Sequence, residues 1–396
     1  MDTPSDRSMD TSRALAATQI APGSGPSNHD LPAAAASKLR IDGPPELTMS
    51  VPAATASASN PAQGAHAAPG IHSPSEGGTL ASRVRERVAR TVVGQDEVVD
   101  RILIALITGG HLLLQGVPGL AKTLLVHSVA KATDLAFGRV QFTIDLLPSD
   151  IVGAEMLDEA TRTFRVHKGP IFTNLLLADE INRATPKVQS ALLEAMQERK
   201  VTIGSASMRL PTPFLVIATQ NPVEQAGTFE LPEAQLDRFM MCHRLTYPTK
   251  DQEAEVLKRS LGLGLTRDAG GGAVPKSAFD AVADTPSVKL SELTDAMEQV
   301  QKVHVSDVFI RHCVELADRT RNHPEIDLGC SPRAGIALVQ AARARAFLKG
   351  RDYATPEDLY ALAPDVMLHR MRLTYDAMAR GRTTATVLEE ILAQAV

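Results

Sequence analysis

Apolar residues follow two different periods along this chain, and the change between them divides it. Between residues 81 and 250, short apolar runs near Leu112, Val140, Leu175 and Phe214 alternate with stretches of helical spacing. Such runs are typical of strands buried on both faces, and their alternation with helices predicts an α/β fold with a parallel sheet flanked by helices. In this class of fold, ligands bind at the carboxyl ends of the strands.

From residue 251 onward the apolar spacing is helical throughout. Helices are predicted at 251–261, 290–303, 306–322, 333–349, 356–363 and 384–395. Thr355 and Pro356 make a good helix start, because threonine caps an N-terminus and proline is tolerated in the first turn. Glycines between 262 and 275 predict a flexible insert. We therefore predict an α/β core at 81–250 and a small helical lid domain at 251–396.

The first 80 residues have a different composition from the rest. They are rich in alanine, proline, serine and glycine, as in 33–36 and 51–70. A segment of this kind buries too little apolar surface to offset the entropy lost on ordering. Residues 1–80 are predicted to be a disordered tail, either an inert extension or a regulatory one.

The run HLLLQGVPGLAKTL at 111–124 combines a strand, a glycine-bearing loop and a helix start. The candidate nucleotide-binding residues are Gly116, Val117, Pro118, Gly119, Leu120, Ala121, Lys122, Thr123 and Leu124. Backbone N–H groups in such a loop point at phosphates; Lys122 adds positive charge there, and the Thr123 hydroxyl suits Mg²⁺. The general pattern has glycine where Ala121 stands, and alanine costs little if that position is helical. An ordinary strand–turn–helix with a surface lysine remains the alternative.

Two further apolar runs end in polar residues. LLLADE at 175–180 predicts a buried strand followed by Asp179, a candidate Mg²⁺ ligand, and Glu180, which is placed to polarise a water molecule. FLVIAT at 214–219 ends before Asn221 and Pro222, where an amide could orient the attacking water. Taken singly, each could be a strand end with acidic or turn residues. Following the 111–124 run in this order, they favour nucleotide hydrolysis.

Composition limits the function classes. The net charge is −5, only 4% of the residues are aromatic and there is no tryptophan, which argues against a bulk basic or base-stacking nucleic-acid binder. Cys242, Cys313 and Cys330 are too far apart for metal-ligand spacing, so they are predicted to be reduced thiols that are buried or partly buried. The N-terminus lacks an apolar signal region and the longest apolar run near the loop is too short to span a bilayer; we expect a cytoplasmic protein without membrane insertion.

Several long stretches resemble the MoxR family of AAA+ ATPases. They are VVGQDEVVDRILIALITGGHLLLQGVPGLAKTL, QFTIDLLPSDIVGAEML, FRVHKGPIFTNLLLADEINRATPKVQSALLEAMQE, IATQNPVEQAGTFELPEAQLDRFM and GCSPRAGIAL, in the family's order. The resemblance covers about residue 82 to the end. Alanine before the loop lysine also resembles this family.

The resemblance implies a role for each matching residue. Lys122 and Thr123 resemble the Walker A pair, Asp179 the Walker B magnesium ligand, Glu180 the general base, Asn221 sensor 1, Arg238 the arginine finger and Arg333 sensor 2, while Gly94 and Gln95 resemble the segment near the adenine. A finger acts on the nucleotide of a neighbouring subunit, so it implies a ring. Arg333 at the inner edge of the lid is expected to let γ-phosphate occupancy set the angle between lid and core.

The resemblance further implies a Mg-ATP-hydrolysing, chaperone-like remodeller or maturation factor for a protein client. It implies a ring, a hexamer, with ATP and Mg²⁺ as cofactors and a partner carrying a von Willebrand factor A domain. No nucleic-acid partner is expected. The alternatives are a chelatase-type metal-insertion ATPase subunit, a ring motor acting on nucleic acid, and a nucleotide switch that does not hydrolyse.

Two segments, 150–167 and 201–210, are predicted to be insertions that face the substrate. The alternative is that they are hairpins that only pack against their neighbours.

Overall fold

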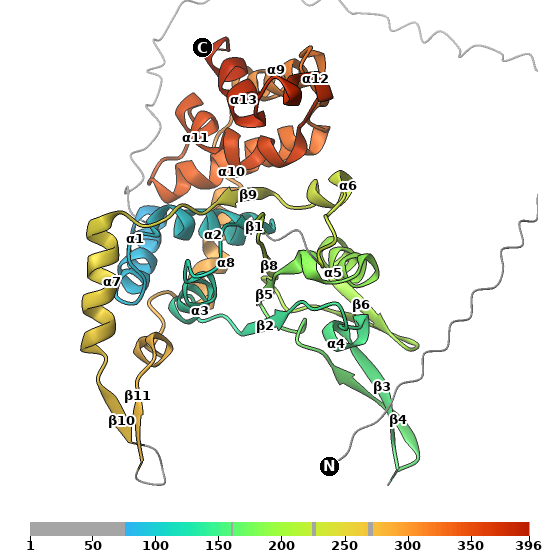
Figure 1. The fold of residues 1–396 in the computed structure, drawn as a ribbon, viewed down its shortest axis with the longest axis vertical. Coiled ribbons are helices and arrows are strands. Elements are labelled where there is room, and N and C mark those ends of the chain that lie inside the picture. The colour runs from blue at the N-terminus through green and yellow to red at the C-terminus, as the bar shows by residue number, and fades with distance from the viewer. Residues whose placement is uncertain (1–75, 160, 224–226, 268–271, 396) are drawn as a thin grey trace, which may run out of the picture. The chain divides into compact units, whose positions relative to one another are not determined.

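A five-stranded parallel sheet organises the core. The computed structural model describes residues 76–159, 161–223, 227–267 and 272–395. The strand order is β2-β5-β8-β1-β9 (Figure 1). The bounds are β1 Leu112–Gln115, β2 Phe137–Gln141, β5 Leu175–Asp179, β8 Leu215–Gln220 and β9 Met241–Arg244. The four strands predicted from apolar runs are thereby confirmed, and β9 is an additional edge strand.

Both faces of the sheet are covered, which explains the unbroken apolar runs. Leu112 and Leu114 belong to the hydrophobic core on one face, and Leu113 belongs to the core on the other. Helices α1 (Glu76–Ala89), α2 (Asp96–Thr108) and α3 (Lys122–Ala132) contribute to the first core, and α5 (Pro186–Glu198) to the second. Figure 1 shows α3 and α5 on opposite sides of the strands. The predicted α/β sheet with flanking helices is confirmed.

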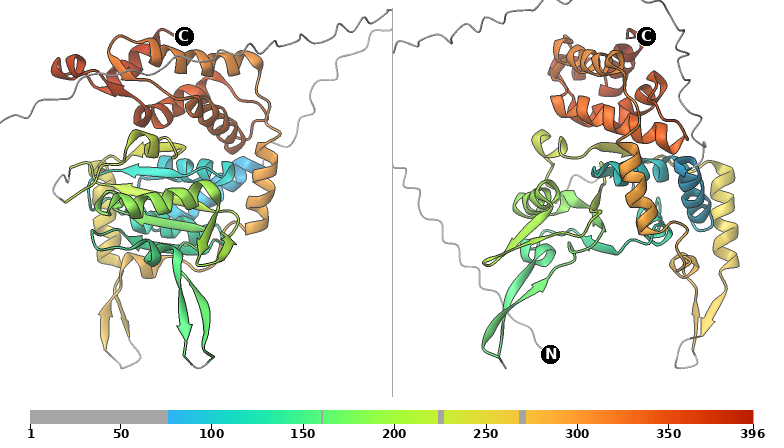
Figure 2. Two further views of the ribbon diagram at one scale, coloured as in Figure 1. Left: turned by 90° about the vertical axis from the view of Figure 1, so that its right-hand side faces the viewer. Right: turned by 180° about the vertical axis from the view of Figure 1, so that it is seen from behind.

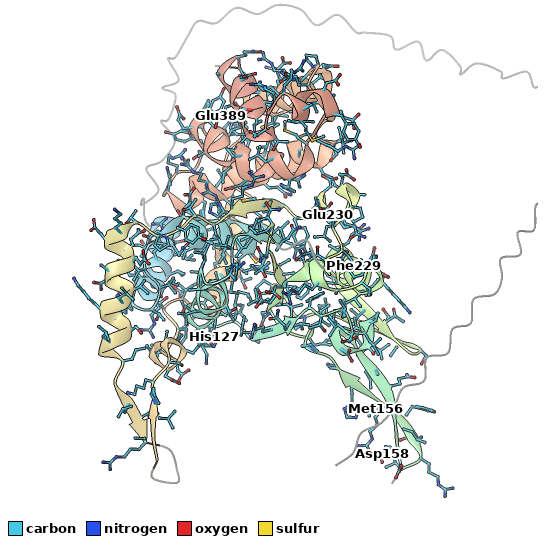
Figure 3. The ribbon with its side chains drawn as sticks, viewed as in Figure 1. His127, Met156, Asp158, Phe229, Glu230 and Glu389 are labelled. Carbon is cyan, nitrogen blue, oxygen red and sulfur yellow. The ribbon has the colours of Figure 1, made fainter. Side chains whose placement is uncertain are left out.

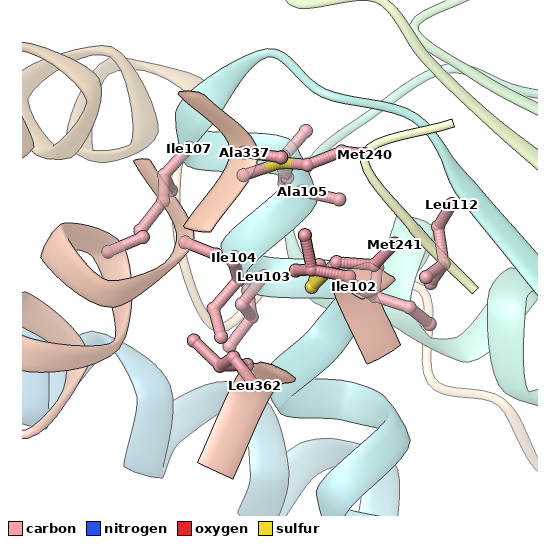
Figure 4. Close-up of a cluster of buried hydrophobic side chains, with 14 of the residues drawn as sticks. Ile102, Leu103, Ile104, Ala105, Ile107, Leu112, Met240, Met241, Ala337 and Leu362 are labelled. Atoms are coloured by element: carbon pink, nitrogen blue, oxygen red, sulfur yellow. The ribbon is translucent and has the colours of Figure 1, made fainter. Parts of the chain in front are cut away.

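Helix α2 joins the core to the C-terminal helices. All residues from 102 to 107 are buried, so this part of the helix has no solvent face. Its side chains lie among Met240 and Met241 near β9, Ala337 of α10 (Pro332–Leu348) and Leu362 of α11 (Pro356–Met367) (Figure 4). The helical lid therefore shares one hydrophobic core with the sheet.

Two inserted hairpins project from the α/β core. After α4 (Pro148–Val152) come β3 (Gly153–Asp158) and β4 (Thr163–Lys168), and β6 (Lys200–Ile203) pairs with β7 (Ala206–Arg209). The hairpin predicted at 201–210 is confirmed, and 150–167 forms a short helix and a second hairpin. Met156 and Asp158 lie on the projecting β3 (Figure 3). Figure 2 shows the β3–β4 hairpin and the strand pair β10 (Leu265–Arg267) and β11 (Ala273–Pro275) extending from the same end of the core.

The C-terminal part is mainly helical, as predicted, but contains two small ladders. The helices are α7 Lys250–Gly262, α8 Leu290–Val300, α9 Asp307–Asn322, α10, α11, α12 Tyr375–Ala379 and α13 Thr384–Ala393. Within the glycine-rich insert at 262–275, β10 (Leu265–Arg267) pairs with β11 (Ala273–Pro275), and β12 (Ile326–Leu328) pairs with β13 (Arg372–Leu373). The purely helical prediction was wrong there, because strands of two or three residues are too short to show a period of two. Part of the insert, 268–271, lies outside the described residues.

The cysteines are buried free thiols, as predicted. Burial raises the pKa of Cys242 and Cys313 to about 12 and that of Cys330 to about 11. Among the residues the structure describes, no group of histidine, cysteine and carboxylate side chains is arranged to hold a metal ion by itself. Nor does that part of the chain contain a helix with the length and apolar character needed to cross a membrane.

The predicted tail extends too far toward the core. Residues 1–75 lie outside the described residues, but 76–80 form the start of α1, where Gly77 and Leu80 are buried. A Cβ on Gly77 would come within 2.1 Å of the Phe347 carbonyl oxygen, so the first turn of α1 packs closely on α10. Five residues assigned to the tail are thus part of the folded structure.

A pair of truncations tests this boundary. A chain starting at residue 81 is expected to be less stable than one starting at residue 76 by about 2 kcal/mol, because it loses the buried Leu80 side chain and the contact of Gly77. Urea denaturation followed by circular dichroism measures the difference. Equal midpoints for the two chains would show that the first turn of α1 contributes nothing.

Candidate nucleotide-binding site

The loop after β1 is shaped by its glycines. Gly119 has φ of +89°, in the left-handed region that favours glycine. A Cβ on Gly116 would lie 2.9 Å from Cβ of Leu245, so this position also needs glycine. Helix α3 begins at Lys122, whose Nζ donates to the Gly116 carbonyl oxygen at 2.8 Å. The loop, the helix start and the ammonium group together make a site for phosphate.

Two carboxylates balance the charge of the loop lysine. Partial burial lowers the pKa of Lys122, and the carboxylates of Asp179 and Glu180 act in the opposite direction. The lysine is therefore within electrostatic range of Asp179, the last residue of β5, and of Glu180, which follows it. This arrangement connects the loop with the second predicted motif.

Ala121 does not meet the condition under which alanine costs little. It is the N-cap of α3 and has φ of +52° and ψ of 27°, which is left-handed rather than helical. An alanine in this region carries a steric penalty that glycine does not. The chain therefore holds a strained residue directly before Lys122.

Replacing Ala121 by glycine is expected to stabilise the fold by about 0.5–1 kcal/mol, because the relief at positive φ exceeds the added chain entropy of the unfolded state. Thermal unfolding measures the effect. The control is Ala130→Gly in the interior of α3, where alanine is buried and helical, and it is expected to destabilise by about 1 kcal/mol. A lower melting temperature for Ala121→Gly than for the wild type would contradict the interpretation that Ala121 is strained.

Asp179 ends β5 and is held by two hydroxyl groups and a guanidinium. Thr219 Oγ1 donates to its Oδ1 at 2.6 Å, and Thr123 Oγ1 lies 3.4 Å from its Oδ2. Arg139 of β2 forms an ion pair with Oδ2 at 2.8 Å. The carboxylate is thus oriented toward the loop, and one of its oxygens is paired with the positively charged Arg139 side chain.

Glu180 follows Asp179 in a left-handed conformation, with φ of +57°. Its backbone N–H donates to Thr219 Oγ1 at 2.8 Å. Its Oε2 accepts from Gln141 at 2.9 Å and pairs with Arg183 at 3.1 Å. The side chain is therefore turned along the carboxyl end of the sheet, where a water molecule could approach it.

Asn221 follows β8, which lies between β5 and β1 in the sheet. It is buried, and its Oδ1 accepts from the Val223 N–H at 3.2 Å. Because parallel strands end at one edge, the structure brings five predicted residues together there. We call Lys122, Thr123, Asp179, Glu180 and Asn221 the phosphate cluster.

A pocket of about 670 Å³ adjoins the phosphate cluster, and we call it the base pocket. From the residues predicted to contact nucleotide, Gln95, Pro118, Gly119, Leu120, Ala121 and Leu124 line it. Gly94, at φ of +73°, lies against Gln252 of α7 and precedes Gln95. Tyr247, Val256 and Leu257 add apolar surface to its lining. The size and lining suit a purine and ribose beside the phosphates.

The two predicted arginines lie elsewhere. Arg238 and Arg333 line a pocket of about 330 Å³ with Arg199 and Arg370, which we call the arginine pocket. Its walls include residues 108–111, at the amino end of β1. Lys122 follows the carboxyl end of β1, and a strand of four residues spans roughly 10 Å. Arg333 therefore lies toward the end of β1 opposite to the one that Lys122 follows, and its role as a sensor of the nucleotide stays a prediction.

Sequence reasoning missed several residues of the site. Arg139 and Gln141 alternate on the solvent-edge strand β2, and Thr219 lies within an apolar run. The only sequence signal for Arg139 and Gln141 was their alternation with apolar positions. Tyr247 and α7 enter the base pocket from beyond β9, a position that no motif marked.

Comparisons with known proteins agree with this geometry. A family model described as "ATPase family associated with various cellular activities (AAA)" matches residues 111–241, and an AAA lid domain model matches 318–391. The protein YeaC of Bacillus subtilis (strain 168) is 41% identical over 79% of this chain and 93% of its own length. Chaperone MoxR1 of Mycobacterium tuberculosis is 40% identical over 83% and 87%.

A solved structure of an ATPase candidate from Cytophaga hutchinsonii superimposes with a TM-score of 0.70 at 42% identity, covering 80% of this chain and 96% of that one. A magnesium-chelatase 38 kDa subunit of Acidiphilium rubrum is more distant, at 28% identity. The AAA and lid models, the sheet and its phosphate cluster identify an ATP hydrolase. The chain belongs to the MoxR family of AAA+ ATPases.

Proposed function

We propose that this chain assembles into a head-to-tail ring, a hexamer, that hydrolyses Mg-ATP to remodel or mature a protein client. The observation that carries this proposal is the separation of the phosphate cluster and the arginine pocket by the length of β1. One chain supplies nucleotide-binding residues at one end of the strand and exposed arginines at the other. A second copy joins the two, which is the contact that a closed ring repeats.

Within the phosphate cluster, we assign a role to each side chain. Lys122 and the N–H groups of the loop hold the β- and γ-phosphates. Glu180 accepts a proton from the attacking water, and Asn221 orients that water or the γ-phosphate. Desolvation of Lys122 strengthens its attraction for phosphate, because charges interact more strongly away from bulk water.

Thr123 and Asp179 fit a Mg²⁺ ion. Their oxygens lie 3.4 Å apart, and hydroxyl and carboxylate oxygens are the ligands that this ion takes in phosphate sites. Bound there with ATP, Mg²⁺ neutralises charge on the β- and γ-phosphates. Thr219 holds Asp179 in the orientation that this contact requires.

Arg238 and Arg333 are proposed to act on the nucleotide of the neighbouring subunit. Both side chains are exposed and share one pocket, so a neighbour's γ-phosphate can approach them together. This replaces the expected lever between Arg333 and its own nucleotide with a contact between subunits. The division into a core and a lid at 251–396 remains part of the proposal, with the core beginning at residue 76 rather than 81.

The β3–β4 hairpin is the proposed client-facing surface. It exposes Met156, Leu157 and Phe164, the last at 70%, and Met156 lies on the projecting strand (Figure 3). Neighbouring exposed apolar side chains are typical of a protein interaction site. The β6–β7 hairpin packs beside it, since Glu155 lies against Gly204. A partner with a von Willebrand factor A domain is a further proposal, resting on the family resemblance alone.

Two alternatives lead to different assays. A chelatase-type subunit, suggested by the more distant relative, predicts ATP turnover coupled to metal insertion. A nucleic-acid motor predicts ATPase stimulation by DNA with steep salt dependence. Neither is favoured by the −5 net charge or by the exposed apolar hairpin.

The test of the ring is turnover against protein concentration. Turnover per subunit is expected to rise with assembly, because each active site is completed by a neighbour's arginines. Light scattering in ATP and in ADP gives the mass in parallel. Constant turnover per subunit in a monomer would contradict the ring.

A further inference from the structure

One lid arginine holds the segment that carries Arg238. Arg370, at the end of η3 (Leu368–Arg370), is 5% exposed. Its Nε donates to Asp237 Oδ1 at 2.8 Å, and its Nη2 donates to the carbonyl oxygens of Phe239 at 2.6 Å and Asp237 at 3.4 Å. Its Nη1 donates to the Met240 carbonyl at 3.2 Å. The residues on both sides of Arg238 are therefore bound by a single guanidinium.

Asp237 also contacts the start of α10, the lid helix that carries Arg333. Ser331, the N-cap of α10, donates to both carboxylate oxygens of Asp237 at 3.0 Å. Arg333 lies at the start of that helix, with its Nη1 3.7 Å from Asp237 Oδ2. The Asp237 carboxylate thus contacts both Arg333 and Arg370, and Asp237 directly precedes Arg238 in the chain.

The contacts of Arg370 require a guanidinium. Its planar fork reaches one carboxylate and several backbone carbonyls at once, which a lysine ammonium cannot do. Burial lowers the pKa of Arg370, and its hydrogen bond to the Asp237 carboxylate acts in the opposite direction. Neighbouring His369 adds a contact from its Nε2 to the Phe239 carbonyl at 3.2 Å. Two neighbouring lid residues, His369 and Arg370, therefore bind the backbone on either side of Arg238.

We propose that Arg370, through Asp237, is a positioning residue that sets Arg238 and Arg333 for the nucleotide of the neighbouring subunit. This inference rests on the proposed trans action of those arginines. The lid of each chain would then contribute to the active site of the neighbouring subunit. Movement of the lid then changes how well a subunit activates its neighbour, while its own phosphate cluster is unaffected.

Rings mixed from two variants test separately the two roles of a subunit, which are to supply arginines to its neighbour and to hydrolyse its own ATP. A Glu180→Gln subunit supplies arginines but does not hydrolyse, and an Arg238→Ala subunit supplies a working phosphate cluster without a finger. Adding Arg370→Lys to the Glu180→Gln subunit is expected to reduce the restored turnover about tenfold or more, because displacement by about 1 Å is costly for catalytic groups. Adding it to the Arg238→Ala subunit is expected to leave restored turnover within about twofold.

The matched control is Arg345→Lys, which alters another lid arginine whose buried ion pair with Asp358 stays within the lid. It is expected to leave both arms within about twofold. Asp237→Asn, of nearly the same shape, serves as the second variant if Arg370→Lys does not fold. It is expected to show the same asymmetry between the arms.

Each outcome has one meaning. Loss in the arginine-supplying arm alone supports positioning by Arg370. Equal loss in both arms, or no loss in either, overturns it. Absence of restored turnover with Arg370 intact, in rings shown to be mixed, instead contradicts the trans action itself.

Discussion

Glu180→Gln is expected to lower ATP turnover by about 10²–10⁴-fold while leaving ATP binding nearly unchanged, because glutamine keeps the shape of the side chain but accepts no proton. Gln141 and Arg183 contact Glu180 Oε2, so the carboxylate is held at the carboxyl end of the sheet. The base is not needed to bind phosphate, which is the role assigned to Lys122. Steady-state turnover and equilibrium binding of a fluorescent ATP analogue measure the two effects separately.

Glu194→Gln is the matched control, since Glu194 is an exposed acidic residue of α5 and lies on a helix rather than at a strand end. Its turnover is expected to stay within about twofold of the wild type. The Glu180→Gln protein is also expected to retain its ring in ATP, because the nucleotide persists. Wild-type turnover in Glu180→Gln would place the base on another side chain.

The sequence predicted the sheet because burial on both faces leaves a clear mark. Leu112, Leu113 and Leu114 point to alternate sides and all three are fully buried, so no polar residue interrupts the run. It also predicted the phosphate cluster, because polar residues that directly follow such runs lie at one edge of a parallel sheet. Local order along the chain was sufficient for both.

Contacts between distant segments were not predictable in this way. Arg139 and Asp179 are 40 residues apart and meet only because β2 pairs with β5. The place of Arg333 depends on where α10 packs, and its N-cap Ser331 is bound to Asp237 of a distant segment, which Arg370 also contacts. The same is true of α7 in the base pocket. A motif identifies the residue type, but tertiary packing decides which end of the strand it reaches.

Arg238→Ala is expected to reduce turnover by about 10³–10⁵-fold in a ring of identical subunits, because an arginine supplied in trans stabilises the charge of phosphoryl transfer. ATP binding should remain, since Arg238 lies at the opposite end of β1 from Lys122. Mixing with Glu180→Gln subunits is expected to restore part of the turnover, because each Glu180→Gln subunit offers an intact Arg238 to a working neighbour. Arg209→Ala, which removes an exposed arginine from the β6–β7 hairpin, is the control and should change turnover by no more than about twofold. Native mass spectrometry can establish whether mixed rings form. If they form and turnover is not restored, Arg238 acts within its own chain or only in folding. If turnover is restored in proportion to the fraction of mixed interfaces, the Arg238 guanidinium acts on the neighbour's γ-phosphate.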